Sequence, residues 1–216
     1  MLVVMSGDLI DLWNGVDPIW RPAFELAWES FQAGSIGIGA VLVDPNGAIV
    51  SAGRNRRNEL GGPGQIGGSN LAHAEVNALA LLPPGVYTDH VLYTTVEPCL
   101  LCISALRLSH VGTVRFATTD PYWDGIDGIV DLNENIAKRW PKREGPLDGP
   151  LRTWAMAVPM VDFNLRRTPW LDLIGGGMPE AMAVAQHLIS AGDRIKALTL
   201  DEAIEIAWPR LVVSPA

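Results

Sequence analysis

The sequence His73-Ala74-Glu75, followed after 22 intervening residues by Pro98-Cys99-Leu100-Leu101-Cys102, decides how this chain is interpreted. One imidazole and two thiols are ligand types that bind zinc, and a set of three leaves a fourth coordination position open. An open position is typical of catalytic zinc sites, because structural sites are closed. Glu75 places a proton-carrying carboxyl group beside the metal. The pattern predicts a catalytic zinc ion held by His73, Cys99 and Cys102, with Glu75 as the catalytic residue.

The spacing also predicts how these residues are presented. Cys99 and Cys102 are three residues apart, so on a helix that starts near Pro98 they share one face in the first turn. The free N–H groups and the dipole of that turn favour thiolates. His73 and Glu75 are two residues apart, roughly 200° around a helix. Both reach one metal only if it lies over the N-terminus of their helix, so we expect two helix N-termini directed at one zinc ion.

Two alternatives compete with the catalytic interpretation. A Cys-x-x-Cys pair by itself is also a redox motif, although this leaves His73 and Glu75 without a role. A zinc ion that only joins two helices is the second alternative. The other histidines have turn-like or surface settings, and we expect structural or surface roles for them: His90, His110 and His187.

Composition narrows the class of protein. A formal net charge of −8 and a pI near 4.9 argue against a large nucleic-acid surface, which normally carries a basic footprint. The only two cysteines lie too close together to link distant parts of a secreted fold. The apolar start Met1–Met5 lacks the basic segment of a signal peptide, and no apolar run approaches the ~20 residues of a membrane helix. We therefore expect a cytoplasmic protein that does not bind a membrane.

Local signals place the motif in an α/β fold. A helix is predicted from Pro22 to Gln32, and Asp44-Pro45-Asn46-Gly47 predicts a hairpin turn between two short strands. Strands and helices then alternate, with strands at 38–43, 48–52, 91–95 and 111–117, and helices from the glycine-rich segment to before Pro83 and from Pro98 to about Leu108. The order predicts a layered α/β sheet with helices on its faces.

The C-terminal part follows a looser pattern. We expect residues 1–140 to form the catalytic domain with an N-terminal leader, and residues 141–216 to form an extension packed on the same domain. The sequence predicts a helix over Ile129–Ala137, a fifth strand over Ala155–Val161, and two helices near Pro179–Ala191 and Leu200–Leu211. Thr199 and Glu202 have capping-box spacing at the start of the last helix.

From about Pro22 to Asp120 the chain resembles the cytidine deaminase superfamily, in particular the branch of tRNA adenosine deaminases, guanine deaminases and deoxycytidylate deaminases. The H-x-E…P-C-x-x-C spacing is a known signature of zinc deaminases. The resemblance covers about half the chain and rests on Gly39–Val43, Gly53–Asn55, His73–Glu75, Thr95–Cys102 and Ser104-Ala105. It implies a three-layer α/β/α fold with a central five-stranded mixed sheet, here with a C-terminal helical extension, and it implies a homodimer.

Several residues are candidates for reading the substrate. The resemblance implies that Asn55 hydrogen-bonds the substrate and that the Ala40 backbone contacts the base edge. Trp123 follows a strand end, where α/β sheets place ligands, and it can stack on a ring or simply pack on the core. The cluster Arg54, Arg56 and Arg57 has two interpretations, a phosphate site or a solvated loop edge. We interpret the glycine-rich segment 61–68 as a mobile rim near the pocket.

The predicted activity is that of a zinc-dependent aminohydrolase. It converts the exocyclic amino group of a small nucleobase, nucleoside or nucleotide to an oxo group and releases ammonia, and guanine- or cytosine-type rings rank ahead of adenine. The expected partners are this amino-heterocycle and water, with Zn2+ as cofactor and no nucleic acid. The alternative is adenosine-to-inosine editing of tRNA. The acidic charge and the unmatched segment after about Trp140 favour the small molecule.

Overall fold

A five-stranded mixed sheet forms the centre of the molecule. The computed structural model describes residues 6–168 and 171–212, so the start Met1–Met5 lies outside the described residues. The strand order is β2-β1-β3-β4-β5, with β1 antiparallel to β2 and β3, and with β3, β4 and β5 parallel. This confirms the predicted sheet. The strands are β1 (Gly39–Val43), β2 (Ile49–Arg54), β3 (Val91–Val96), β4 (Thr113–Thr118) and β5 (Lys142–Glu144).

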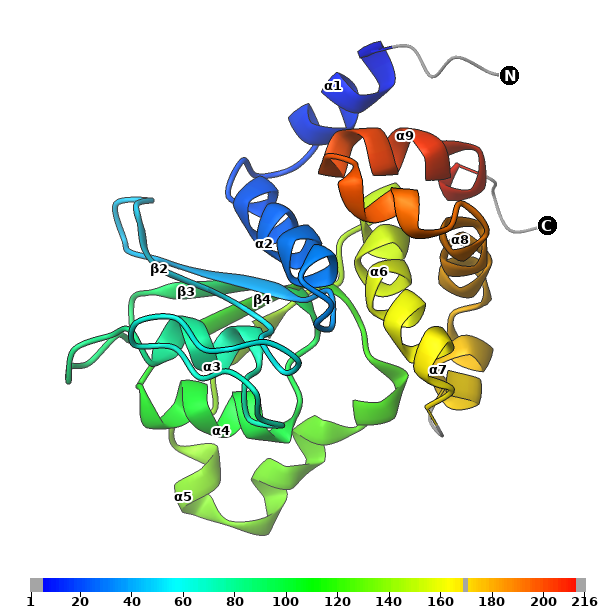
Figure 1. Cartoon of the computed structure of the whole chain (residues 1–216). Coiled ribbons are helices and arrows are strands. Elements are labelled where there is room, and N and C mark those ends of the chain that lie inside the picture. The colour runs from blue at the N-terminus through cyan, green and yellow to red at the C-terminus, as the bar shows by residue number, and fades with distance from the viewer. Residues whose placement is uncertain (1–5, 169–170, 213–216) are drawn as a thin grey trace.

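Helices cover both faces of the sheet (Figure 1). Helices α2 (Trp20–Gln32) and α6 (Pro150–Arg166) pack on one face, and α3 (Ala74–Leu79) and α4 (Leu100–Leu108) lie on the other. Successive side chains of a strand point to opposite faces. In β1, Val41 therefore joins the core under α2 and α6, whereas Leu42 joins the core under α3 and α4. The predicted α/β/α layers are thus present.

The predicted fifth strand at Ala155–Val161 is wrong. These residues lie inside α6, and the fifth strand is β5, a short edge strand of charged residues. Helix α6 lies between the sheet and α8 (Pro179–Ser190), so apolar residues surround it, and an apolar run of this kind does not show a helical period. The helix predicted over Ile129–Ala137 is replaced by a 3-10 segment, Ile126–Leu132, and the short α5, Glu134–Ala137.

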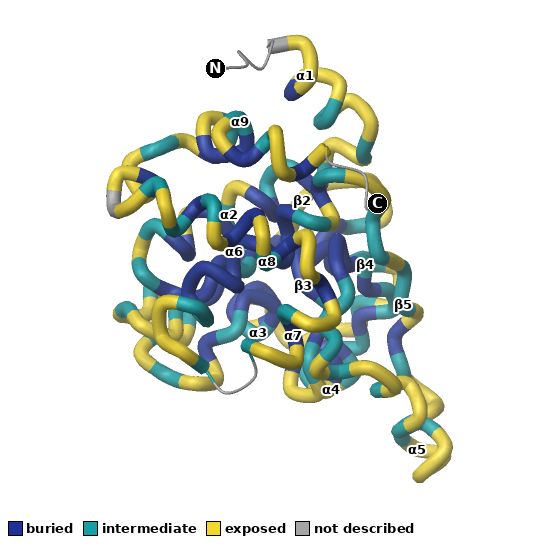
Figure 2. The backbone as a smooth tube through the Cα atoms, turned by 90° about the vertical axis from the view of Figure 1, so that its right-hand side faces the viewer, coloured by how far each residue is buried: buried dark blue, intermediate teal, exposed yellow. Residues whose placement is uncertain are grey.

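The C-terminal helices add a further layer on the outer side of α6 (Figure 1). Both predicted helices are confirmed, as α8 and as α9 (Leu200–Leu211), and the capping box of Thr199 and Glu202 is present. In Figure 2 the central helices are buried, whereas α5 is mostly exposed. The remaining helices are α1 (Ser6–Asn14) and α7 (Leu171–Gly177), with 3-10 segments at Pro121–Trp123 and Asp193–Ala197. The division of the chain at residue 140 stays a prediction.

Two contacts join the N-terminal segment to the last helix. The indole nitrogen of Trp13 in α1 donates to Asp201 at 3.1 Å, and Arg21 of α2 pairs with the same carboxylate at 2.7 Å. Trp28 of α2 packs against Trp154 of α6 with ring centroids 5.7 Å apart. The first two helices therefore pack with the last helix in one body. Within the described residues, no helix has the length and apolar character needed to span a membrane.

Gly53 of β2 allows α3 to approach the sheet closely. A Cβ at this position would overlap backbone atoms of Ala74 and Ala78 in α3. Overpacking of this kind costs about 1–3 kcal/mol or more, since backbone has little room to move. We expect Gly53→Ala to lower the thermal unfolding midpoint by about 2–4 °C for each kcal/mol lost. Gly128→Ala is the matched control, because a Cβ there has no neighbour within 4 Å. Equal midpoints for the two variants would contradict the expectation.

Candidate metal centre

His73, Cys99 and Cys102 come together at the N-termini of two helices. His73 is the N-cap residue of α3, Cys99 is the N-cap residue of α4, and Cys102 lies in the first turn of α4. Their candidate ligand atoms lie within 4.8 Å of one another. This is the arrangement that the spacing predicts. His73 is 26 residues from Cys99 and 29 from Cys102, so the fold brings the imidazole to the two sulfurs.

The separations fit a tetrahedral zinc ion. His73 Nδ1 lies 3.6 Å from the Cys99 sulfur and 3.4 Å from the Cys102 sulfur, and the two sulfurs are 3.5 Å apart. Zinc bonds of about 2.3 Å to sulfur and about 2.0 Å to nitrogen, at tetrahedral angles, give edges of about 3.5–3.8 Å. A disulfide would need about 2.05 Å between the sulfurs, and both cysteines are free. The donor set therefore fits zinc.

Protonation of the two cysteines differs. The hydrogen bond with Cys102, together with His73, lowers the pKa of Cys99 to about 4. Burial raises the pKa of Cys102 well above its usual range. The hydrogen bond with Cys99 raises the pKa of His73, against an opposing effect of burial. Cys99 is thus already a thiolate at neutral pH, and Cys102 loses its proton when it becomes a ligand.

Glu75 lies beside the three ligands in the first turn of α3. Its side chain is buried, with 4% of its surface exposed, and Thr94 of β3 donates a hydrogen bond to its Oε1 at 3.3 Å. Burial raises the pKa of its carboxyl group, and the charge of Cys99 adds to this shift. A raised pKa brings a carboxyl group closer to the range in which it can both accept and donate a proton.

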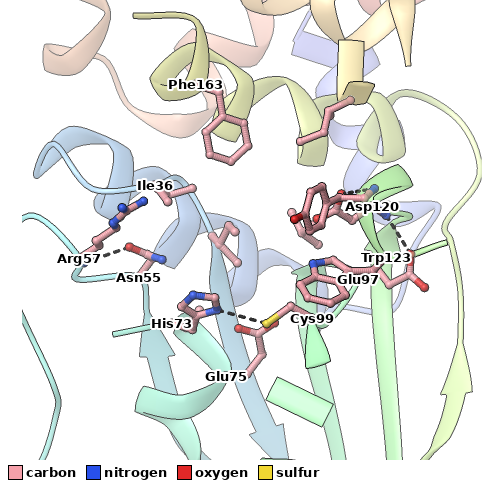
Figure 3. Close-up of a pocket in the computed structure, with 15 residues that line it drawn as sticks. Ile36, Asn55, Arg57, His73, Glu75, Glu97, Cys99, Asp120, Trp123 and Phe163 are labelled. Atoms are coloured by element: carbon pink, nitrogen blue, oxygen red, sulfur yellow. Dashed lines mark hydrogen bonds between the residues drawn. The ribbon is translucent and has the colours of Figure 1, made fainter. Parts of the chain in front are cut away.

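A cavity of about 250 Å³ opens over the metal ligands. His73, Glu75 and Cys99 form its floor (Figure 3). Phe163 of α6 lies across the cavity from His73, and Ile174 of α7 also lines it (Figure 3). The other lining residues are Ile36, Ile38, Asn55, Arg57, Ala74, Val96, Glu97, Asp120, Tyr122 and Trp123. The C-terminal helices therefore complete the wall of a cavity whose floor comes from the first half of the chain.

Two of the three residues predicted to contact substrate line this cavity. Asn55 is buried on one side, and Trp123 lies on the opposite side (Figure 3). Ala40 lies inside β1, fully buried and paired with both neighbouring strands, and it is not among the lining residues. Ile38, two residues earlier, lines the cavity instead.

A chain of polar contacts holds the loop that carries Trp123. The backbone N–H of Asp120 donates to Glu97 at 2.8 Å, and Arg143 of β5 forms a buried ion pair with Glu97. The carboxylate of Asp120 accepts from the Tyr122 backbone at 3.0 Å. Burial raises the pKa of Asp120 to about 6. The loop is therefore fixed to the segment just before Cys99.

The glycine-rich segment 61–68 is held against α3 and contributes no residue to the cavity lining. Asn77 of α3 accepts a hydrogen bond from the Ile66 backbone at 2.7 Å and donates to the Ile66 carbonyl at 3.1 Å. The backbones at Gly61 and Gly67 lie so close that a Cβ on either would overlap the other strand of the loop. These contacts give the glycines a packing role rather than a place at the pocket mouth.

Sequence reasoning missed several cavity residues. Phe163 and Ile174 lie in the segment after Trp140, which matches no family motif, so the sequence carries no signal for them. Glu97 precedes Pro98 inside the recognised motif, and its acidic type next to the zinc helix was an available signal. Ile36 precedes the first predicted strand and Ile38 begins it, and nothing in the sequence distinguishes either from an ordinary core residue.

Comparison with known proteins agrees with this geometry. Residues 18–118 match the family model described as the cytidine and deoxycytidylate deaminase zinc-binding region. The chain is 30% identical over 122 residues to the tRNA-specific adenosine deaminase of Aquifex aeolicus, covering 55% of this chain and 76% of that protein. The chain belongs to the cytidine deaminase-like superfamily. The family model describes a zinc-binding region. The cluster of His73, Cys99 and Cys102 is therefore suited to bind Zn2+.

Other matches are partial or structural. The chain is 30% identical over 122 residues to the tRNA(Ile)-lysidine synthase of Deinococcus radiodurans, covering 55% of this chain but only 19% of that protein. A crystal structure of NE0047 in complex with 2,6-diaminopurine has the same fold, with a TM-score of 0.50 and 22% identity over 74% of this chain and 90% of that one. The chain therefore matches only a small part of some relatives, such as the lysidine synthase, and most of others, such as the adenosine deaminase.

Proposed function

We propose that this protein is a zinc-dependent aminohydrolase that acts on a small nucleobase, nucleoside or nucleotide. The reaction adds water to the ring carbon that carries the amino group, replaces the amino group with an oxo group and releases ammonia. The position of Glu75 carries this proposal. Its buried carboxyl group lies beside the three zinc ligands and faces the cavity, where a substrate ring and water can meet.

Glu75 moves the protons of this reaction. When bound, zinc supplies the positive charge that lowers the pKa of water to about 7. Glu75 accepts a proton from the attacking water and delivers it to the neighbouring ring nitrogen. It then transfers the second proton to the leaving amino group, so that ammonia departs and the ring carbon becomes an oxo carbon. Thr94 holds the carboxyl group in place through its hydrogen bond.

The walls of the cavity suit a planar heterocycle. Trp123 presents an aromatic ring on one side and Phe163 closes the side opposite His73. Aromatic and apolar walls favour a flat ring. Asn55 supplies a polar group that can hydrogen-bond the substrate from the side opposite Trp123.

The cover over the cavity and the charge of the chain favour a small molecule. The volume of about 250 Å³ holds a single base or nucleoside. Phe163 and Ile174 cover the cavity from the C-terminal helices, and the net charge is −8. A nucleic-acid surface normally needs a basic patch.

Ammonia release from the zinc-loaded protein tests the proposal. The panel contains cytosine, guanine and adenine, each also as nucleoside and as nucleoside monophosphate. We expect at least one member to release ammonia, with cytosine- and guanine-type rings ahead of adenine. A panel in which no member is turned over, with zinc verified in the protein, would remove the small-molecule assignment.

Adenosine-to-inosine editing of tRNA is the second candidate. The match to the tRNA-specific adenosine deaminase of Aquifex aeolicus supports it. Inosine formed in an anticodon stem-loop would establish this activity. Absence of RNA binding at low salt, where phosphate contacts are strongest, would remove it.

The proposal also includes a setting for the protein. We place it in the cytoplasm, since the two cysteines act as reduced zinc ligands. We expect a homodimer on the basis of the superfamily resemblance. Light scattering of the purified protein measures its mass directly, and a monomer at micromolar concentration would contradict the dimer.

A further inference from the structure

One arginine at the cavity mouth has no role in the chemistry described above. Arg54, Arg56 and Arg57 follow β2 as a basic cluster. Arg54 and Arg56 both pair with Glu59, at 2.8 and 3.2 Å, and Arg56 also donates to Gln65 at 2.8 Å. Across residues 6–168 and 171–212, Arg57 has no ion-pair partner, and it is the member of the cluster that lines the cavity. Two arginines of the cluster thus serve the loop, and the third is available to a ligand.

Asn55 joins Arg57 to the interior of the cavity. Its side chain is 2% exposed, and its Oδ1 accepts a hydrogen bond from the Arg57 backbone N–H at 3.0 Å. The amide oxygen is therefore occupied, and the amide nitrogen turns toward the cavity (Figure 3). This wall presents two hydrogen-bond donors, the Asn55 amide inside and the exposed Arg57 guanidinium at the mouth.

The carboxyl groups of the cavity lie elsewhere. Glu75 is on the floor, and Glu97 and Asp120 lie on the side of Trp123, opposite Asn55 and Arg57 (Figure 3). The cavity thus has one positively charged rim in a chain with a net charge of −8. An arginine guanidinium matches phosphate oxygens with two parallel hydrogen bonds, and it stays charged at any pH of interest.

We propose that Arg57 binds the phosphate group of the substrate, so that the substrate class is a nucleoside monophosphate. This rests on the proposed function. The base lies between Trp123 and Asn55 over the metal site, and the ribose phosphate extends toward the mouth. The exposed position of Arg57 suits this role, because a phosphate that stays partly hydrated costs less to bind than one that is fully buried.

A mononucleotide fits the site better than a nucleic acid does. Phe163 and Ile174 cover the cavity on the side of the C-terminal helices, which limits what can extend from the base. A nucleic acid is held by several phosphate contacts along its backbone. Arg57 is one guanidinium at one end of the cavity, and its cluster neighbours are already paired, Arg54 with Glu59 and Glu29 and Arg56 with Glu59. A single cation at the cavity mouth matches a single phosphate group.

Matched pairs of nucleoside and nucleoside monophosphate test the proposal on the zinc-loaded protein. For each base, the ratio of kcat/KM for the monophosphate to that for the nucleoside is measured in wild type, Arg57→Ala, Arg57→Lys and Arg152→Ala. Arg57→Ala keeps the backbone N–H that holds Asn55, so the fold should be unaffected. Arg152 is an exposed arginine of α6 outside this cavity and serves as the control.

We expect wild type to prefer the monophosphate and Arg57→Ala to lower the ratio about 10- to 100-fold, the range of a charged hydrogen bond. The loss should be a rise in KM for the monophosphate with little change in kcat, because the phosphate is bound equally before and during the reaction. Arg57→Lys should restore part of the preference, and Arg152→Ala should keep all of it. A ratio that Arg57→Ala leaves unchanged overturns the inference while the deaminase assignment stands.

Binding separates failure of this inference from failure of the proposed function. Calorimetry measures binding of cytidine and cytidine monophosphate, and the guanine pair, to the same four proteins. If no compound releases ammonia, tighter monophosphate binding that is lost in Arg57→Ala still supports the phosphate site. Equal binding of the two members of each pair overturns it. Turnover confined to an anticodon stem-loop, and reduced by Arg57→Ala, would assign the arginine to RNA and overturn the mononucleotide.

Discussion

Replacing Glu75 with glutamine is expected to lower ammonia release by about 10²–10⁴-fold, the usual contribution of a general acid–base residue. Glutamine is nearly the same size as glutamate and can still accept the hydrogen bond from Thr94, but it cannot take a proton from water. Because Glu75 is not among the three metal ligands, zinc should remain bound. Ammonia release and zinc content of the same preparation measure the two outcomes together.

Glu134→Gln is the matched control for this substitution. Glu134 lies in the exposed helix α5, away from the cavity, so the same chemical change there should leave both the rate and the zinc content as in wild type. Full activity of Glu75→Gln would remove the carboxyl group from the mechanism. Loss of zinc from Glu75→Gln would mean that the carboxyl group serves the metal rather than the protons.

The metal centre could be predicted from the sequence because its residues carry short-range signals. Cys99 and Cys102 follow a proline that starts a helix, and His73 precedes another helix, so local structure alone predicts two helix N-termini. The two-residue spacing of His73 and Glu75 then requires the metal to lie over the end of that helix. The central sheet followed from short apolar runs that alternate with predicted helices and from one clear hairpin turn.

The cavity roof could not be predicted in this way. Phe163 lies in α6, whose apolar surroundings on all sides hide the helical period, and this is why part of that helix was predicted as a strand. β5 consists of three charged residues at a sheet edge, so it has no apolar pattern to recognise. In both α6 and β5, contacts with the rest of the fold rather than a local sequence pattern decide the secondary structure. The ion pairing of Arg54 and Arg56 with Glu59 likewise depends on the loop fold, and only this pairing shows which arginine is available.

In the proposed function, the residues for the reaction and the residues for substrate selection come from different parts of the chain. The candidate metal ligands and Glu75 lie between His73 and Cys102, inside the region matched by the family model. Phe163 and Ile174, which line the cavity, lie outside the region that the family model matches. Helix α6 packs against α2 and the sheet, so the position of Phe163 is fixed relative to His73 and Glu75 on the cavity floor. Substitutions in the two parts should accordingly affect turnover and substrate choice separately.

Replacing His73 with alanine is expected to abolish both zinc retention and activity. Two thiols remain, but one of three ligands and its fixed position at the start of α3 are lost. At a free zinc concentration 1,000-fold above its dissociation constant, binding stabilises a protein by about 4 kcal/mol. For a chain of this size that corresponds to a thermal midpoint higher by roughly 8–16 °C. Wild type should lose this increment when a chelator is added, and His73→Ala should show no response to chelator.

His187→Ala provides the control for the histidine substitution. His187 lies in α8, far from the ligands in sequence, and its ring contacts the Ile206 carbonyl at 3.0 Å. This variant should keep its zinc, its activity and its response to chelator. If His73→Ala retains zinc after dialysis, the imidazole is not a ligand, and the site becomes a pair of thiols without a defined open position. If the wild-type midpoint does not change with chelator while activity disappears, the metal contributes to the reaction but little to the fold.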